Sequence, residues 1–213
     1  MKLTKDMLLL YAVTDRAWTL RRTLYEQIKE ALAGGVTMIQ LREKQLTRPE
    51  LICEARALLP LCHSYGAPLI VNDDAEAAVL AGADGVHVGA EDCPVSELRR
   101  RFGPDLIIGA TAKTVEQAQR AEAAGADYLG VGAVFPSPTK SSALRITAAQ
   151  LKEICNSVRI PAVAIGGIDK DNMAQLKDCG MAGFAVVSAV FGAADISSAA
   201  ASLKKQARAI IGG

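Results

Sequence analysis

The stretch AGADYLGVG, residues 124–132, decides the fold, because three other segments of the chain repeat its pattern. They are AGGVTMIQL (33–41), AGADGVHVG (81–89) and CGMAGFAVVS (179–188). Each has the end of a helical pattern, then a glycine, then an apolar run. Glycine suits the left-handed residue that closes a helix, and a continuous apolar run is typical of a parallel strand covered on both faces. The pattern therefore predicts repeated helix–turn–strand units.

Eight apolar runs of this kind occur along the chain, with helical patterns between them. Eight strands alternating with eight helices in 213 residues predict an α/β fold, a single-domain (β/α)8 TIM barrel over residues 1–213. No Pro- or Ser-rich linker divides the chain, and a doubly wound open sheet is the alternative. The predicted strands lie near residues 8–13, 36–41, 68–71, 84–88, 106–109, 127–132, 161–165 and 184–187.

Composition and charge indicate which partners to expect. Lys and Arg number 24 against 23 Asp and Glu, which predicts no nucleic-acid partner and no membrane partner. No apolar run approaches the length of about 18 residues that a membrane span needs, and the N-terminal run is interpreted as a buried strand rather than a signal peptide. The five dispersed cysteines are typical of reduced thiols in a cytoplasmic protein. The sequence leaves open whether the chain forms a homo-oligomer.

In a barrel of this type the active site lies where the strands end, so residues that follow the strands are candidates. After the second strand, Gln40, Arg42 and Lys44 alternate with Leu41 and Glu43. Alternate side chains of an extended segment point the same way, and two cations on one face predict a clamp for an anion. The alternative is a solvent-exposed charged run in which Glu43 pairs with a neighbour.

Acidic residues follow the third and fourth strands. The third ends in Asn72, Asp73 and Asp74, and the fourth is followed by Glu91 and Asp92. Carboxylates from neighbouring strands could hold Mg²⁺, with water and a substrate phosphate completing its ligands. The alternative is that one acid of each cluster caps the following helix.

The later strands add small and polar groups. Thr111 and Lys113 follow the fifth strand, Gly166 and Gly167 the seventh, and Ser188 the eighth. A glycine pair lets backbone amides approach a phosphate, although it is also common in tight turns. The sixth strand breaks into the loop PSPTK (136–140), in which two prolines restrict the backbone around two hydroxyls and an ammonium group.

Histidines offer little acid–base chemistry. His63 is predicted at the surface and His87 in a packed structural position within the fourth strand. The predicted mouth therefore contains cations, carboxylates and backbone amides, which suit the stabilisation of charge more than proton transfer.

Together these segments resemble the thiamine-phosphate synthase family. The resemblance runs nearly end to end, and QLREK (40–44) and GVGAVFPSPTK (130–140) are its specific elements. It implies an Mg²⁺-dependent transferase that couples hydroxymethylpyrimidine diphosphate with thiazole phosphate, giving thiamine phosphate and pyrophosphate. We expect a dissociative substitution in which C–O cleavage precedes attack by the thiazole nitrogen, because that nitrogen needs no protein base.

The resemblance also implies roles for individual residues. Asp73 and Asp92 would bind Mg²⁺, and the catalytic residues would be Arg42, Lys44, Thr111 and Lys140. The substrate-binding residues would be Gln40, Leu41, Arg42, Glu43, Lys44, Asn72, Thr111, Ser137, Pro138, Thr139, Lys140, Gly167, Val187 and Ser188.

The chain departs from the family pattern at three positions: Asp74 replaces a frequent arginine, Ala90 a frequent glutamine, and Lys113 a histidine or small residue. Two other functions stay open. One is a related barrel that isomerises thiazole phosphates without a metal, and the other is a catalytically silent regulator that binds a phosphorylated metabolite.

Overall fold

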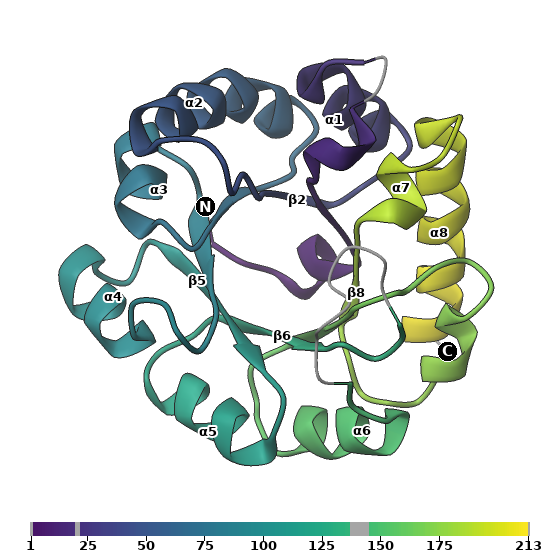
Figure 1. Cartoon of the computed structure of the whole chain (residues 1–213). Coiled ribbons are helices and arrows are strands. Elements are labelled where there is room, and N and C mark those ends of the chain that lie inside the picture. Colours follow the sequence, from purple (N-terminus) through teal and green to yellow (C-terminus); the bar gives the residue numbers. More distant parts are fainter. Residues whose placement is uncertain (1, 20–21, 137–144, 213) are drawn as a thin grey trace.

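A closed parallel barrel forms the centre of the molecule. The computed structural model describes residues 2–19, 22–136 and 145–212. Within these ranges, eight parallel strands pair in sequence order and β8 pairs with β1, which confirms the predicted barrel and excludes the open sheet (Figure 1). The strands are β1 Leu10–Val13, β2 Met38–Leu41, β3 Leu69–Asn72, β4 Gly85–Val88, β5 Ile107–Ala112, β6 Tyr128–Gly132, β7 Ala162–Ile165 and β8 Gly183–Val186.

Helices surround the barrel as an outer ring (Figure 1). They are α1 Leu24–Ala33, α2 Arg48–Ser64, α3 Ala75–Ala81, α4 Val95–Phe102, α5 Val115–Ala123, α6 Ala148–Asn156, α7 Ser188–Phe191 and α8 Ile196–Ile211. Short 3-10 helices are η1 Lys5–Leu8, η2 Arg16–Trp18 and η3 Met173–Leu176.

Strict alternation of strand and α-helix was wrong at one place. The connection between β7 and β8 contains η3, whereas α7 and α8 both follow β8. Asp169 and Asn172 explain this, because each side chain accepts a hydrogen bond from the other residue's backbone N–H at 3.0 Å. Such local bonds offer the backbone an alternative to a regular helix.

The helices begin where the sequence supplies caps. Thr23, Thr47 and Thr147 form reciprocal capping boxes with an acid or amide three residues on. Asp74 and Thr114 accept hydrogen bonds from the first turns of α3 and α5. These caps fix where each strand-to-helix loop ends, and so they position the residues of the barrel mouth.

The strands bury both of their faces. In β2, Met38 belongs to the cluster inside the barrel, while Ile39 and Leu41 pack between the strands and the helices. The segment before β1 closes the N-terminal end of the barrel, because Leu3 and Met7 pack against the inner cluster. Figure 1 shows this purple segment across the centre of the ring. The other end of the barrel is therefore the open mouth.

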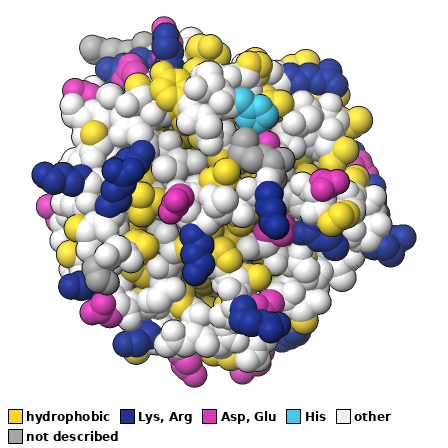
Figure 2. All heavy atoms as spheres, turned by 180° about the vertical axis from the view of Figure 1, so that it is seen from behind, with side chains coloured by type: hydrophobic (Ala, Val, Ile, Leu, Met, Phe, Trp, Pro, Cys, Tyr) yellow, Lys and Arg dark blue, Asp and Glu magenta, His cyan; other side chains and the backbone are white. Residues whose placement is uncertain are grey.

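The closed end carries scattered charge. Figure 2 shows basic and acidic side chains of the described residues mixed over this face. Within the described ranges, no helix is both long and apolar enough to cross a membrane. All five cysteines are free thiols.

Candidate active site

The segment QLREK begins inside the barrel and ends at the mouth. Gln40 is buried in β2, and Arg42 follows the last strand residue, Leu41. The buried Thr14 fixes the backbone of Arg42, since the Thr14 hydroxyl accepts a hydrogen bond from Arg42 N at 2.9 Å and donates one to Arg42 O at 3.4 Å. The Leu41 side chain lies in the shell between strands and helices, so only its backbone could contact a ligand.

Glu43 has a different partner from the one considered from the sequence. Its carboxylate pairs with Arg16 of η2 at 2.5 Å, and its side chain is only 3% exposed. Burial raises the pKa of Glu43, and the Arg16 guanidinium opposes that shift. Pairing with Arg42 or Lys44 is therefore wrong. In the parts of the chain that the structure describes, neither cation takes part in an ion pair, so both can meet an anionic ligand.

Asp73 and Asp92 face one another. Asp73 has a left-handed backbone (φ 65°) in the turn after β3, and its N–H donates to His87 O at 2.9 Å. Asp92 Oδ2 accepts from Gly89 N at 2.7 Å. The pKa of Asp73 rises to about 6 because partial desolvation and the neighbouring Asp92 both disfavour the charged carboxylate, while Lys44 opposes the shift. Two neighbouring carboxylates that repel in this way are a suitable place for a cation.

The residues present fit Mg²⁺ rather than a metal that needs a full protein cage. No group of three or more His, Cys, Asp or Glu within the described ranges could hold a metal ion. Mg²⁺ commonly binds through one or two carboxylates, and waters and substrate phosphates complete its shell. Asp73 and Asp92 match this ligand set.

Capping accounts for only one of the acidic clusters. Asp74 caps α3 through Ala77 N at 2.9 Å and pairs with Arg48 Nε at 2.6 Å. Arg48 thus offsets the charge that Asp74 adds near the mouth. Helix capping by Glu91 or Asp92 is wrong, because α4 begins after Pro94 and the Asp92 carboxylate binds the preceding turn instead.

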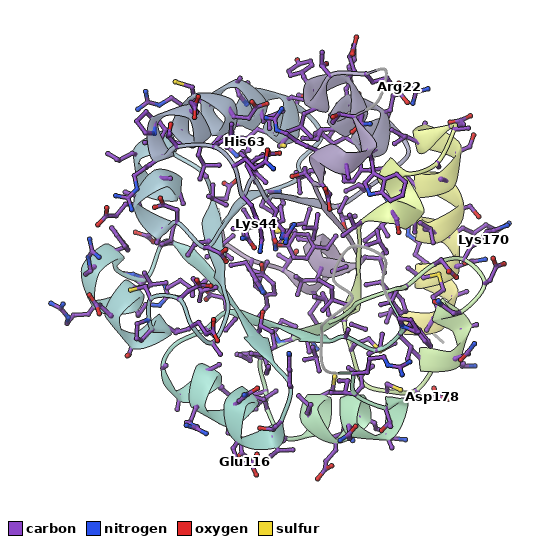
Figure 3. The ribbon with its side chains drawn as sticks, viewed as in Figure 1. Arg22, Lys44, His63, Glu116, Lys170 and Asp178 are labelled. Atoms are coloured by element: carbon purple, nitrogen blue, oxygen red, sulfur yellow. The ribbon has the colours of Figure 1, made fainter. Side chains whose placement is uncertain are left out.

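A hollow of about 290 Å³ opens between the loops that follow β2 and β3. In Figure 3, Lys44 lies over the centre of the ring of helices, whereas Glu116, Lys170 and Asp178 lie at its periphery. Small-molecule sites typically start near 300 Å³, so the hollow is large enough for part of a ligand. Its lining residues are Glu43, Lys44, Leu46, Arg48, Leu51, Asn72, Asp73 and Asp74.

Thr111 lies on the other side of the mouth, near the end of β5. It is half-buried, and its hydroxyl lies 3.1 Å from His87 Nε2. His87 is buried in β4, as predicted, and burial lowers its pKa to about 4. The ring is therefore neutral at pH 7.

The glycine pair after β7 has a clear packing role. Val134 and Phe135 donate to Ile165 O and Gly166 O, each at 3.0 Å. A Cβ at Gly167 would collide with Pro136 O, so glycine lets the chain after β6 approach β7. Val187 and Ser188 follow β8, the strand that pairs with β7, and they begin α7. The predicted loop residues Ser137, Pro138, Thr139 and Lys140 lie outside the described residues.

The comparison with protein families covers the whole of this site. The family model for thiamine monophosphate synthase matches residues 10–190, a span with all the described strands and every predicted site residue. The chain belongs to the thiamine monophosphate synthase family. It is accordingly a transferase enzyme, and the resemblance found in the sequence is confirmed.

Individual relatives support the same family across nearly the full length. A thiamine-phosphate synthase from Clostridium tetani is 42% identical over 190 residues, covering 89% of this chain and 91% of the relative. One from Pyrococcus furiosus is 42% identical over 208 residues, covering 98% and 99%. The solved structure of thiamine phosphate pyrophosphorylase from P. furiosus aligns with a TM-score of 0.90, at 40% identity, over 97% of this chain and 98% of that chain.

Four residues of this family member were missed from the sequence. Arg16 and Arg48 pair with Glu43 and Asp74, yet nothing in the local pattern marks their partners. Tyr11 and Tyr128 bond to each other inside the barrel. The sequence does contain a signal for this pair, because each tyrosine stands in an otherwise apolar strand. A buried tyrosine hydroxyl needs a hydrogen-bond partner, so a tyrosine at such a position indicates a polar contact inside the barrel.

Proposed function

We propose that this synthase couples a pyrimidine diphosphate with a thiazole phosphate, releasing pyrophosphate. The pyrimidine CH2–O bond breaks first, and its electron pair leaves with pyrophosphate. The lone pair of the thiazole nitrogen then forms the new C–N bond. Charge balances without a protein base, because that nitrogen has no proton to lose.

The cations of the mouth would bind the diphosphate. Arg42 and Lys44 are free of ion pairs within the described ranges, and Lys44 lies close enough to Asp73 to lower its pKa. Asn72 and Thr111 would contact the pyrimidine part from β3 and β5. Asp73 and Asp92 would hold Mg²⁺, which would offset the charge of the departing pyrophosphate.

Residues of the later loops would hold the second substrate. Ser137 and Thr139, with the backbone at Gly167, Val187 and Ser188, would bind the thiazole phosphate. Lys140 would contact the leaving diphosphate. If so, Lys140→Ala should lower turnover on the order of 10²-fold, as the loss of a charge-stabilising transition-state contact does. Turnover within about threefold of wild type would contradict the role of Lys140.

One observation carries the proposal: two neighbouring carboxylates, Asp73 and Asp92, lie beside Lys44, which forms no ion pair with any residue that the structure describes. This combination suits a metal-bound diphosphate. An isomerase that rearranges thiazole phosphates without a metal would have no use for it. The predicted cytoplasmic location also rests here, since free thiols suit a reducing compartment.

Pyrophosphate release tests the reaction. The chain is incubated with Mg²⁺ and both substrates, and with each substrate alone, and pyrophosphate is measured over time. We expect release only with both substrates and strong suppression by EDTA. Isomerised thiazole phosphate without pyrophosphate would support the isomerase instead.

A further inference from the structure

A chain of buried hydrogen bonds crosses the barrel beneath the mouth. Gln40 Nε2 donates to Tyr11 Oη at 2.7 Å, and the Tyr11 and Tyr128 hydroxyls lie 2.8 Å apart. Tyr128 Oη lies 3.1 Å from His87 Nδ1, and His87 Nε2 lies 3.1 Å from Thr111 Oγ1. The chain thus joins β2, β1, β6, β4 and β5. Its two ends are residues that the proposed reaction uses.

The donors and acceptors give this chain one direction. The Gln40 amide nitrogen can only donate, so the Tyr11 proton has a single acceptor among the described residues, Tyr128 Oη. The Tyr128 proton must then go to His87 Nδ1. The neutral ring carries its proton on Nε2 and donates it to Thr111 Oγ1.

Thr111 is left with its own hydroxyl proton. No acceptor for that proton lies within hydrogen-bond distance in the described ranges. Thr111 is half-buried at the mouth, whereas the other members of the chain are buried. The proton is therefore available to a ligand in the mouth.

Glycines make room for this arrangement. A Cβ on Gly109 of β5 would overlap the Tyr128 ring and lie 2.5 Å from His87 Nδ1. A Cβ on Gly130 of β6 would lie 3.0 Å from His87 Cε1. Neither glycine has a positive φ, so space rather than backbone conformation requires glycine there. The barrel interior is shaped around the chain.

We propose that Tyr11, Tyr128 and His87 are positioning residues that fix the Thr111 hydroxyl as a hydrogen-bond donor to the bound pyrimidine diphosphate. The identity of this ligand rests on the proposed function, whereas the donor-to-acceptor direction of the hydrogen bonds from Gln40 to Thr111 does not. Without the Tyr128 hydroxyl, His87 Nδ1 loses its donor and can itself carry the ring proton. Nε2 would then accept from Thr111, and the ligand would lose its donor.

Nuclear magnetic resonance of ¹⁵N-histidine-labelled full-length protein tests the direction directly. We expect the substrate-free enzyme to show His87 as the Nε2–H tautomer at pH 7.5, with the signals assigned by their loss in His87→Gln. The Nδ1–H tautomer in the wild-type protein would overturn the proposal. This measurement does not depend on catalytic activity. The only variant that it needs is His87→Gln, which serves to assign the signals.

A double-mutant cycle tests the link to the ligand. Calorimetry measures the binding of the pyrimidine diphosphate with Mg²⁺, so the result is independent of the pyrophosphate-release assay. Tyr128→Phe should weaken binding about fivefold, the value of roughly one neutral hydrogen bond. In a Thr111→Val background the same change should have less than about a twofold effect, because the hydroxyl it orients is absent.

Controls separate positioning from general destabilisation. Thr111→Ser retains the hydroxyl and should restore the sensitivity to Tyr128→Phe. Tyr25→Phe removes a hydroxyl on the exposed face of α1 and should change neither the His87 tautomer nor binding. An equal loss from Tyr128→Phe in the wild-type and Thr111→Val backgrounds would show a merely structural role and overturn the proposal.

Discussion

Arg16 Nε lies 2.5 Å from the Glu43 carboxylate, and this ion pair ties the loop after β1 to the segment that carries Arg42 and Lys44. The Glu43 side chain is almost enclosed, and its Oε1 has no hydrogen-bond partner within the described ranges. The charge of Glu43 therefore depends on Arg16. Glu54 gives Arg16 a second contact at 3.1 Å.

Arg16→Ala should lower the free energy of unfolding by about 1–2 kcal/mol. The cost exceeds that of a surface pair because a nearly buried carboxylate loses its counter-charge, but half-exposed Arg16 keeps it below that of a fully buried pair. Urea denaturation measures the change. Arg22→Ala is the matched control, because Arg22 and Glu30 are both 37% exposed, and it should cost only about 0.5 kcal/mol. Equal losses would contradict the special position of Glu43.

His87 should make the protein less stable in mild acid. Its pKa falls from 6.5 to about 4 on folding, so the unfolded state binds more protons between these values. The free energy of unfolding should therefore decrease by about 2 kcal/mol through this group as the pH falls from 7.5 to 5. From about pH 7.5 upward His87 is almost entirely neutral in both states, so the effect vanishes.

Comparison with His87→Gln isolates that effect from the carboxylates. Urea denaturation of both proteins at pH 7.5 and pH 5 gives the two pH dependences. Wild type should lose about 2 kcal/mol more than the variant over this interval. Parallel behaviour of the two proteins would mean that folding does not hold His87 neutral.

Gly109→Ala should destabilise the barrel through a collision inside it. The new methyl group would overlap the Tyr128 ring, and overpacking of this kind costs about 1–3 kcal/mol or more. Gly66→Ala provides the comparison, since Gly66 has φ 69° and open space around its Cβ position. That change should cost only the left-handed backbone penalty, about 1–2 kcal/mol. Because Gly109 lies next to the hydrogen-bond chain, only Gly109→Ala should also perturb the His87 NMR signals.

Asp73→Asn and Asp92→Asn should each weaken Mg²⁺ binding by at least about tenfold, because each would remove one of two predicted ligands. The measurement is a calorimetric titration with MgCl2 in the presence of inorganic pyrophosphate. Asp74→Asn is the control: asparagine also caps helices well, and the charge it removes is paired with Arg48. It should change affinity less than about threefold. A similar loss in all three variants would argue for a general charge effect rather than specific ligands.

Local pattern predicted most of the fold, but it failed where polar residues interrupt a regular element. The apolar pattern predicts the fifth strand at 106–109, whereas β5 is Ile107–Ala112, because the polar Thr111 interrupts the apolar run while the strand continues. Asp169 and Asn172 replaced an expected helix by local hydrogen bonds. The apolar runs themselves were found because burial on both faces leaves a continuous pattern in the sequence.

The sequence by itself determined the barrel, the order of its strands and which residues follow them, because these depend on hydrophobic patterns and turns over short distances. It also identified the family through QLREK and its other motifs. Only the tertiary structure decided the partners. Arg16 meets Glu43 across 27 positions, and Tyr11 meets Tyr128 across 117. Sequence spacing sets the side to which a residue points, whereas closure of the barrel decides which distant side chain it meets there.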